Sequence, residues 1–233
     1  MRHFAVLEQA IARAAEDEDA LLSARMHWNV LAGEVHDEEP LYEERVNAFL
    51  EWFLLEYRPV EARALSIEAR AAAGGAAPER VGAGAVEPAI RRLIREAPEA
   101  ERPGLIALAA AHRGLFTVRE PVNEGVLLED LWGGGSFRVY ERRRLIGLGP
   151  GEVFEARLVA DVEAPPRILF TRSFCFHPRE ALEIIRQQVV RARRAGERRD
   201  DVLFRLLRSR LRCERYRHLS PLRIYESGET REF

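Results

Sequence analysis

Cys175 and His177 are the two residues whose types and spacing come nearest to a catalytic pair. They lie two apart in a segment that favours a strand, so both side chains would face one side of a sheet, where a thiolate and an imidazole could act together. No third residue stands out that would orient the imidazole. The alternative is a buried cysteine beside a histidine that begins the next helix, because cysteine is among the most frequently buried residues. A thiol-dependent enzyme therefore ranks last among three functional hypotheses, and we expect a protein that is not an enzyme.

His27, His36 and Asp37 could bind a metal by residue type, with Glu38 and Glu39 beside them. The eight residues between the two histidines do not place them on one helical face, and the sequence lacks the H-E-x-x-H pattern. Two cysteines are also too few for a zinc site of four thiolates. We interpret the segment as the solvated start of a helix, whose dipole favours carboxylates at that end. We expect neither a metal nor a cofactor.

Three consecutive glycines, Gly133, Gly134 and Gly135, raise the question of a phosphate-binding loop. Such a loop needs its glycines at the start of a helix, where free amides and the helix dipole hold the anion. Here the glycines precede "SFRVYE", which alternates between apolar and polar residues as a strand does. The sequence therefore predicts a turn between two strands, with glycine supplying a positive φ angle.

The last predicted helix carries a stripe of arginines spaced three, four and three residues apart. These are Arg205, Arg208, Arg212 and Arg215. Leucines on a different face of the same helix would dock it on the rest of the protein, so the arginines would point outward. Such a face suits nucleic-acid phosphates, an acidic protein surface or anionic lipid. Pairing with acidic helices of the same chain or of a twin subunit is the alternative.

The distribution of charge supports that alternative as well. The chain has 36 basic residues, all of them arginine, and a formal net charge of -2. Residues 1–62 carry fourteen carboxylates against five arginines, whereas residues 186–223 carry thirteen arginines against four carboxylates. These two segments attract each other, so we expect the C-terminal helices to pack back on the N-terminal ones.

The first half of the chain has helical periodicity. We predict a helix over residues 3–26 and a second one after "HDEEP", capped by Asp37 and with Pro40 in its first turn. An Ala/Gly-rich stretch near residues 71–88 favours a flexible connection. Two shorter helices, "PAIRRLIREA" and "PGLIALAAAHRG", follow it, and Gly114 ends the second.

The pattern then changes to short runs rich in Phe, Val, Tyr and Thr, separated by glycine and proline turns. We predict an α+β protein with three parts: a helical N-terminal region over residues 1–113, a small antiparallel β-sheet or partial barrel over 114–177, and two C-terminal arginine-rich helices over 178–233. Pro178 would begin the first of these helices and Gly196 would end it, and Asp200 would cap the second.

Four segments carry a resemblance to a group of uncharacterised bacterial proteins, some of which have zinc-binding SEC-C tails. They are "FLEWFLLEYRP", "HRGLFTV", "EDLWGGGSFRVYERR" and "GEVFEARLV", within residues 49–160. The likeness is one of apolar pattern and turn placement. It implies a helical region followed by a small β unit and implies no activity. The cysteine cluster of a SEC-C tail is absent from this chain.

The leading functional hypothesis is a non-enzymatic interaction or regulatory protein that binds a protein partner or itself through its charged faces. The runner-up is a nucleic-acid-binding protein that uses Arg205, Arg208, Arg212 and Arg215. An anionic membrane surface is the least favoured partner. No apolar run approaches the roughly 20 residues of a membrane-spanning helix. The N-terminus becomes acidic where a secretory signal would be apolar, so we expect a cytoplasmic protein.

Overall fold

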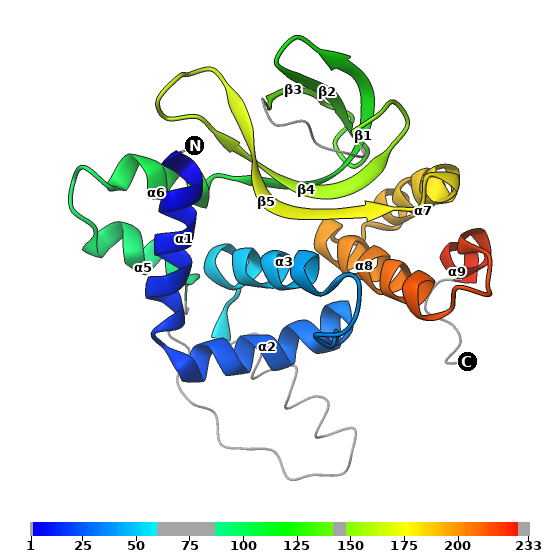
Figure 1. Ribbon diagram of the computed structural model, residues 1–233, viewed down its shortest axis with the longest axis horizontal. Coiled ribbons are helices and arrows are strands. Elements are labelled where there is room, and N and C mark those ends of the chain that lie inside the picture. The colour runs from blue at the N-terminus through cyan, green and yellow to red at the C-terminus, as the bar shows by residue number, and fades with distance from the viewer. Residues whose placement is uncertain (1, 60–86, 142–147, 228–233) are drawn as a thin grey trace.

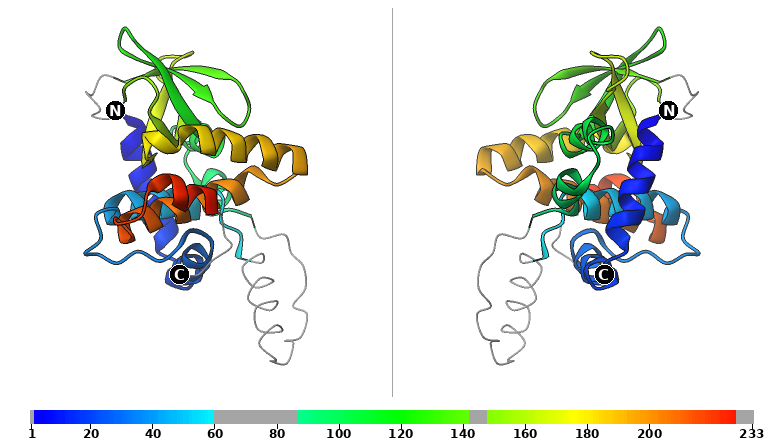
Figure 2. Two further views of the ribbon diagram at one scale, coloured as in Figure 1. Left: turned by 90° about the vertical axis from the view of Figure 1, so that its right-hand side faces the viewer. Right: turned by 90° about the vertical axis from the view of Figure 1, so that its left-hand side faces the viewer.

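The computed structural model describes residues 2–59, 87–141 and 148–227. Figure 1 shows a small barrel of strands at one end of the molecule and helices gathered against it, and both side views in Figure 2 keep that separation. Helices precede and follow the strands in the chain, which confirms the predicted α+β class. None of the helices in these ranges is long and apolar enough to span a bilayer.

The N-terminal region begins with two helices, α1 (Arg2–Ala15) and α2 (Glu18–Ala32), so the prediction of a single helix over residues 3–26 is wrong. The break falls at the acidic run that follows α1. There the Asp17 side chain accepts a hydrogen bond of 3.0 Å from the amide of Ala20 and caps α2. Carboxylates at the start of a helix are favoured by its dipole, which explains why the acidic run begins a new helix.

The central helix is α3 (Tyr42–Leu55), and Asp37 does not cap it: Leu41 occupies the cap position without a side-chain hydrogen bond. Helix α3 lies between α1 and α2 on one side and the last strand on the other, so it is buried almost all round. Its buried apolar side chains include Phe49, Trp52 and Phe53. The apolar segment "FLEWFLL" is therefore the centre of the helical core.

Two short helices, α5 (Ala89–Glu96) and α6 (Arg102–Ala109), follow as predicted. Helix α6 ends at Ala109, well before Gly114, which lies inside a strand instead. The Ala/Gly-rich stretch that favours a flexible connection falls almost wholly outside the described residues.

The five predicted strands are confirmed, with order β1–β2–β3–β5–β4 in a closed barrel. They are β1 (His112–Val122), β2 (Gly125–Asp130), β3 (Ser136–Tyr140), β4 (Val153–Ala160) and β5 (Ile168–His177). The expectation of a purely antiparallel sheet is wrong, because β3 and β5 pair in parallel where Val139 meets Ile168. Successive strands alternate in direction, so placing β5 beside β3 makes those two neighbours parallel.

Strand β1 closes the barrel by pairing along its first half with β4 and along its second half with β2, and the register shifts between Val118 and Glu120. This strand order is the topology of the OB-fold, a five-stranded Greek-key barrel. Phenylalanines from three different strands, Phe116, Phe154 and Phe170, fill its interior. Helices α3 and α6 pack on the outer side of β5 and β4, so β4 is buried on both faces.

After a 3₁₀ turn at Arg179–Ala181, the C-terminal region forms α7 (Leu182–Ala195), α8 (Arg199–Arg215) and α9 (Pro221–Ser227). Gly196 ends α7 with a φ of 72°, as predicted. Asp200 lies within the first turn of α8 and does not cap it, because Arg198 holds that position without a side-chain hydrogen bond. Helix α9 is an addition to the two predicted helices. Helix α8 packs against α2 (Figure 1).

Candidate functional site

Cys175 and His177 are both buried at the end of β5, each with 3% exposure. Burial raises the pKa of the Cys175 thiol to about 12. Burial, together with Arg210 and Arg45, lowers the pKa of His177 to about 3. His177 Nδ1 lies 2.7 Å from the hydroxyl of Tyr225 in α9, so this hydrogen bond holds the ring. At neutral pH the thiol is protonated and the imidazole is neutral, which is the opposite of an activated thiolate–imidazolium pair.

The buried imidazole gives the protein a defined acid sensitivity. An unfolded chain protonates His177 below its ordinary pKa of 6.5, whereas the folded protein resists protonation down to about 3. The contribution of neutral His177 to the free energy of unfolding is therefore fully present above pH 6.5 and decreases as the pH falls. We expect the free energy of unfolding to drop by about 2 kcal/mol between pH 7.5 and 5.0.

Urea titrations at both pH values measure this drop in the free energy of unfolding. His177→Gln should remove most of the drop and His36→Gln, at an exposed position, should retain it. An equal drop in all three proteins would contradict the assignment.

The residues considered as metal ligands are not brought together. His27 lies in α2 with its ring 5.6 Å from that of Trp52, while His36 and Asp37 lie in the exposed turn before α3. The amide of His36 donates to Glu39 Oε2 at 2.9 Å, which orders that turn. Within the described ranges, no three His, Cys, Asp or Glu residues form a group that could hold a metal ion.

The arginine stripe of α8 contacts the acidic end of the same chain. Arg215 lies 2.7 Å from Glu39 and also donates to the carbonyl of Glu34 at 2.6 Å. Arg208 donates to the carbonyl of Leu31, near the C-terminus of α2, where the helix dipole favours cations. Arg205 pairs with Glu197 at 3.0 Å, and Arg212 is half-buried. At least three of the four arginines therefore bond to neighbouring groups of the same chain and fix the position of α8.

Five charged side chains form a cluster between α3 and the barrel. Glu51 and Glu56 come from α3 and the residue after it, and Arg113, Glu155 and Arg157 come from β1 and β4. Arg157 lies 2.6 Å from Glu56 and 3.3 Å from Glu51, and Arg113 lies 2.7 Å from Glu155. The Arg113 guanidinium also covers the ring of Phe204 in α8 at 4.8 Å. We interpret this cluster as structural, because it joins three elements and every member except Glu56 is less than 5% exposed.

The glycines Gly133–Gly135 form the predicted strand-to-strand turn between β2 and β3. Gly134 has a φ of 72°, and its amide donates to the carbonyl of Asp130 at 2.8 Å. The Asp130 carboxylate accepts from the amide of Trp132 at 2.9 Å and lies 3.2 Å from His112 Nε2. The turn is therefore held by its own chain, and it marks one end of the outer face of β2 and β3.

That outer face is the most distinctive exposed surface of the barrel, and we call it the open face. Its members are Arg119, Glu120, Leu127, Arg138, Tyr140 and Arg167. Glu120 is the register partner of Leu127 on β1, so the face carries one exposed carboxylate beside its three arginines. Leu127 and Arg138 are register partners on β2 and β3, and they alternate with side chains that point into the barrel. The Arg167 guanidinium lies over the Tyr140 ring at 4.2 Å. Figure 1 shows β2 and β3 at the end of the molecule farthest from α2 and α3.

Weak contacts order the arginines of the open face without burying them. Arg119 Nη1 lies 3.4 Å from Ser136 Oγ, and Arg138 Nη2 lies 3.4 Å from the carbonyl of Asn123. Sequence alternation could have identified Arg138 and Tyr140 as outward residues of one strand. It could not have found Arg119 and Arg167. The strand order places Arg167, just before β5, beside β3, and Arg119 of β1 reaches Ser136 of β3 through its side chain.

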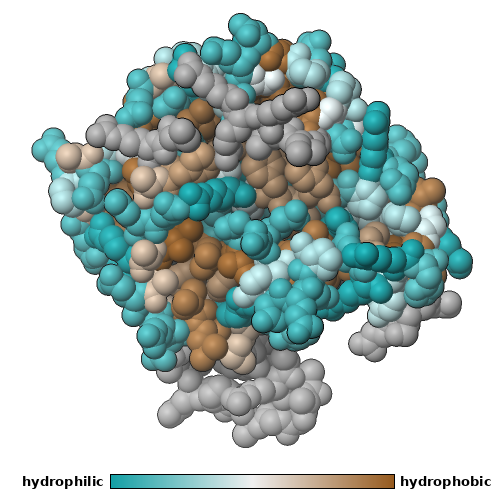
Figure 3. Space-filling model, viewed as in Figure 1, coloured by the Kyte–Doolittle hydropathy of each residue, from teal (hydrophilic) through white to brown (hydrophobic). Residues whose placement is uncertain are grey.

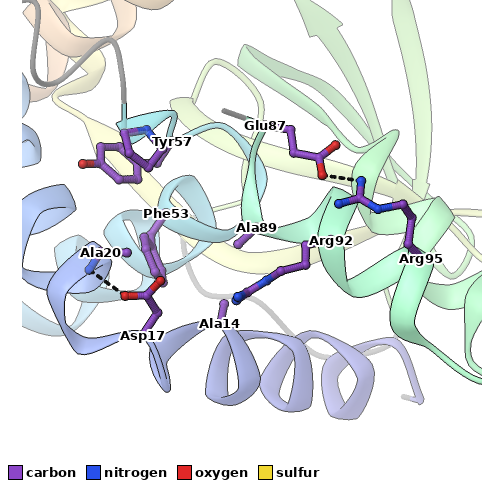
Figure 4. A pocket seen from close by; sticks show the side chains of 10 residues that line it. Ala14, Asp17, Ala20, Phe53, Tyr57, Glu87, Ala89, Arg92 and Arg95 are labelled. Atoms are coloured by element: carbon purple, nitrogen blue, oxygen red, sulfur yellow. Dashed lines mark hydrogen bonds and ion pairs between the residues drawn. The ribbon is translucent and has the colours of Figure 1, made fainter. Parts of the chain in front are cut away.

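A separate pocket of about 360 Å³ lies where α1, α2, α3 and α5 meet. Figure 4 shows Phe53 and Tyr57 on one side and the ion pair of Glu87 with Arg95 on another. Asp17, also in the lining, is engaged in capping α2. Pro59 and Glu87 in the lining bracket the undescribed residues 60–86, so we assign no ligand to this pocket.

Comparisons of this chain with protein-family models, with curated proteins and with solved structures find no match. The class that the geometry defines is a helical protein built around a small OB-topology barrel, with exposed arginines and a half-buried tyrosine on the outer face of β2 and β3 among the described residues. Functional inference therefore depends on the residues of that face and on the other exposed surfaces. The resemblance to proteins with SEC-C tails stays an expectation from the sequence.

Proposed function

We propose that this protein binds single-stranded nucleic acid, without catalysing a reaction, on the open face of its barrel. The observation that carries the proposal is the basic and aromatic surface on β2 and β3, which includes Arg138 and Tyr140 and faces away from the helical core. In OB-topology barrels this face is a common binding surface for oligonucleotides and oligosaccharides. One fold can carry many functions, so the side chains of the open face have to supply the chemistry of binding.

The chemistry of the open face suits a single strand. Exposed Arg119, Arg138 and Arg167 can neutralise backbone phosphates and release their counterions. The Arg167 guanidinium carbon lies over the Tyr140 ring, 4.2 Å from its centroid, and this pair offers a surface on which an unpaired base can stack. Bases within a duplex are already stacked on their neighbours, so this contact favours single strands. Two carboxylates lie on the same side. Glu129 of β2 is paired with Arg186 at 3.3 Å, and Glu120 of β1 is exposed beside Leu127, so the three arginines outnumber it.

The open face is preferred over the α8 stripe as the nucleic-acid surface because of its contacts. Arg208 and Arg215 of the stripe are engaged with α2 and with the turn that follows it. Binding a polyanion there would require breaking those bonds. Within the part of the chain that the structure describes, the hydrogen bonds of Arg119 and Arg138 on the open face are both 3.4 Å long, so phosphates can replace them at little cost.

Fluorescence anisotropy with labelled 20-nucleotide single strands of mixed-sequence DNA and RNA tests the proposal. We expect binding that weakens steeply as salt rises, and a loss of about tenfold for each arginine reversed, hence about a hundredfold for Arg138→Glu with Arg167→Glu. The control is Arg193→Glu with Arg194→Glu, an equal charge change at exposed positions on α7. Absence of binding at 50 mM salt would refute the proposal. Equal losses in both double variants would show general electrostatic attraction. Loss of affinity in Arg212→Glu, with full binding in both double variants, would place the binding site on α8.

A further inference from the structure

Helix α2 exposes a row of apolar side chains that the function of the barrel does not use. Leu22, Met26 and Val30 are 64%, 66% and 77% exposed. They are spaced four residues apart, so they lie along one face of the helix, while Ala24, Trp28 and Ala32 on another face are buried. Figure 3 shows apolar surface in the lower part of the molecule, where Figure 1 places α2. Single exposed apolar residues are common, but a contiguous row indicates an interaction surface. We call it the α2 stripe.

Exposed carboxylates flank the α2 stripe at both ends. Glu18 and Asp19 lie in the first turn of α2, and Glu34, Asp37 and Glu38 lie just beyond its C-terminus. Two nearby arginines are directed inward: Arg25 lies over the Phe49 ring at 5.4 Å, and Arg208 donates to the carbonyl of Leu31. Exposed Arg215 also lies at the C-terminal end, where it is paired with Glu39, so Glu34, Asp37 and Glu38 still leave that end negative. The surface therefore combines an apolar centre with negative charge at each end.

We infer that the α2 stripe binds an amphipathic helix of a partner protein, one with apolar residues three or four apart and with arginine or lysine at both ends. Apolar rows that pack in this way are a recurring mode of helix recognition. Complementary charge at the ends selects the partner and speeds its association. This inference is independent of what the barrel binds, because it concerns a different element.

A second copy of this chain fits the stripe poorly. In an antiparallel pair of α2 helices centred on Met26, Leu22 of one copy would meet Val30 of the other. The same pairing would place Glu18 opposite Glu34 of the other copy, bringing like charges together at both ends. A basic helix removes that repulsion, so it is the better complement.

The test uses a fluorescein-labelled 18-residue peptide that forms an amphipathic helix from leucines on one face and arginines at both ends. We expect the full chain to bind it in anisotropy titrations and Leu22→Gln/Met26→Gln/Val30→Gln to bind at least tenfold more weakly. Glutamine keeps helix propensity and charge, so only the apolar surface changes. The matched control is Ile106→Gln/Val162→Gln/Val190→Gln, which removes three scattered exposed apolar side chains and should leave binding unchanged. Circular dichroism confirms folding of both variants.

Charge is tested separately with Glu18→Gln/Asp19→Gln/Glu34→Gln/Glu38→Gln, which should weaken binding and flatten its salt dependence. Three results would overturn the inference. The first is no binding of the peptide by the unaltered protein. The second is equal binding by the two triple variants, which would reduce the interaction to charge alone. The third is a dimer in analytical ultracentrifugation that the stripe variant dissociates, which would make a second copy the occupant.

Discussion

Replacing Glu51 with leucine is expected to lower the free energy of unfolding by about 3–5 kcal/mol, the typical cost of removing one partner from a buried ion pair. The Glu51 carboxylate accepts a hydrogen bond of 2.8 Å from Thr171 and bonds of 3.0 Å from the amides of Arg172 and Ser173. It also lies 3.3 Å from Arg157. Burial raises the pKa of Glu51 above its ordinary value, although Arg157 and these hydrogen bonds oppose the shift. Since every partner is a donor, the arrangement suits the carboxylate.

Leucine would fill similar space but would leave the amides of Arg172 and Ser173 without this acceptor, and Thr171 would keep a bond of 3.4 Å to the Arg157 carbonyl. Of its two carboxylate partners, the Arg157 guanidinium would retain Glu56 at 2.6 Å. Chemical denaturation monitored by circular dichroism measures the effect. Glu43→Leu, at an exposed position of the same helix, should change stability by less than about 0.5 kcal/mol. Glu51→Gln should fall between the two, because its amide oxygen can still accept. A Glu51→Leu protein as stable as the Glu43→Leu control would show that Glu56 alone compensates Arg157.

Gly125→Ala is expected to cost about 3 kcal/mol, at the upper end of the usual effects of overpacking. A Cβ atom at Gly125 would overlap the carbonyl oxygen of Val139 and would lie 3.2 Å from the Cα of Tyr140. These are backbone atoms of β3, so they cannot rotate out of the way as a side chain could. Strand β2 would have to separate from β3 at the pair Gly125–Tyr140, which lies at the edge of the open face.

Gly149→Ala is the matched control, because its added Cβ would meet no atom of the described residues within 4 Å. It should be neutral or stabilise the protein slightly, since alanine restricts the unfolded chain more than glycine does. The denaturation midpoints of both variants, compared with that of the unaltered protein, measure the two changes in stability. Amide exchange at Val139 and Tyr140 should also quicken in Gly125→Ala. If both variants have the stability of the unaltered protein, β2 and β3 tolerate a local separation and the close approach at Gly125 has no structural importance.

Much of the secondary structure could be predicted because its signals are local. The strands were recognisable from β-branched and aromatic runs between glycine and proline turns, and Gly133–Gly135 were correctly interpreted as a turn. Errors arose at helix ends. Asp17 and Asp37 have the same side chain in similarly acidic runs, yet only Asp17 caps a helix. Their difference depends on where the chain must turn to pack, which the residue types do not encode locally.

The functional surfaces were predicted less well, and charge shows why. The α8 arginines were identified as a stripe, but their partners, among them Leu31, Glu34 and Glu39, lie more than 170 positions away in the sequence. Glu51 lies within the most apolar helix, where nothing in the neighbouring residues indicates its four partners. Whether a charged side chain is available to a partner or belongs to an ion pair or hydrogen bond within the protein depends on residues that lie far away in the sequence.

By itself, the sequence determined the α+β class, the five strands, the turn at Gly133–Gly135 and the attraction between its acidic and basic ends. These features follow from periodicity, turn chemistry and net charge, which act over a few residues or over whole segments. The tertiary structure decided that β5 lies beside β3, that Arg119 and Arg167 join Arg138 on one face, and that Leu22, Met26 and Val30 are exposed. Many strand orders share the same local pattern, and only packing between distant residues selects one of them.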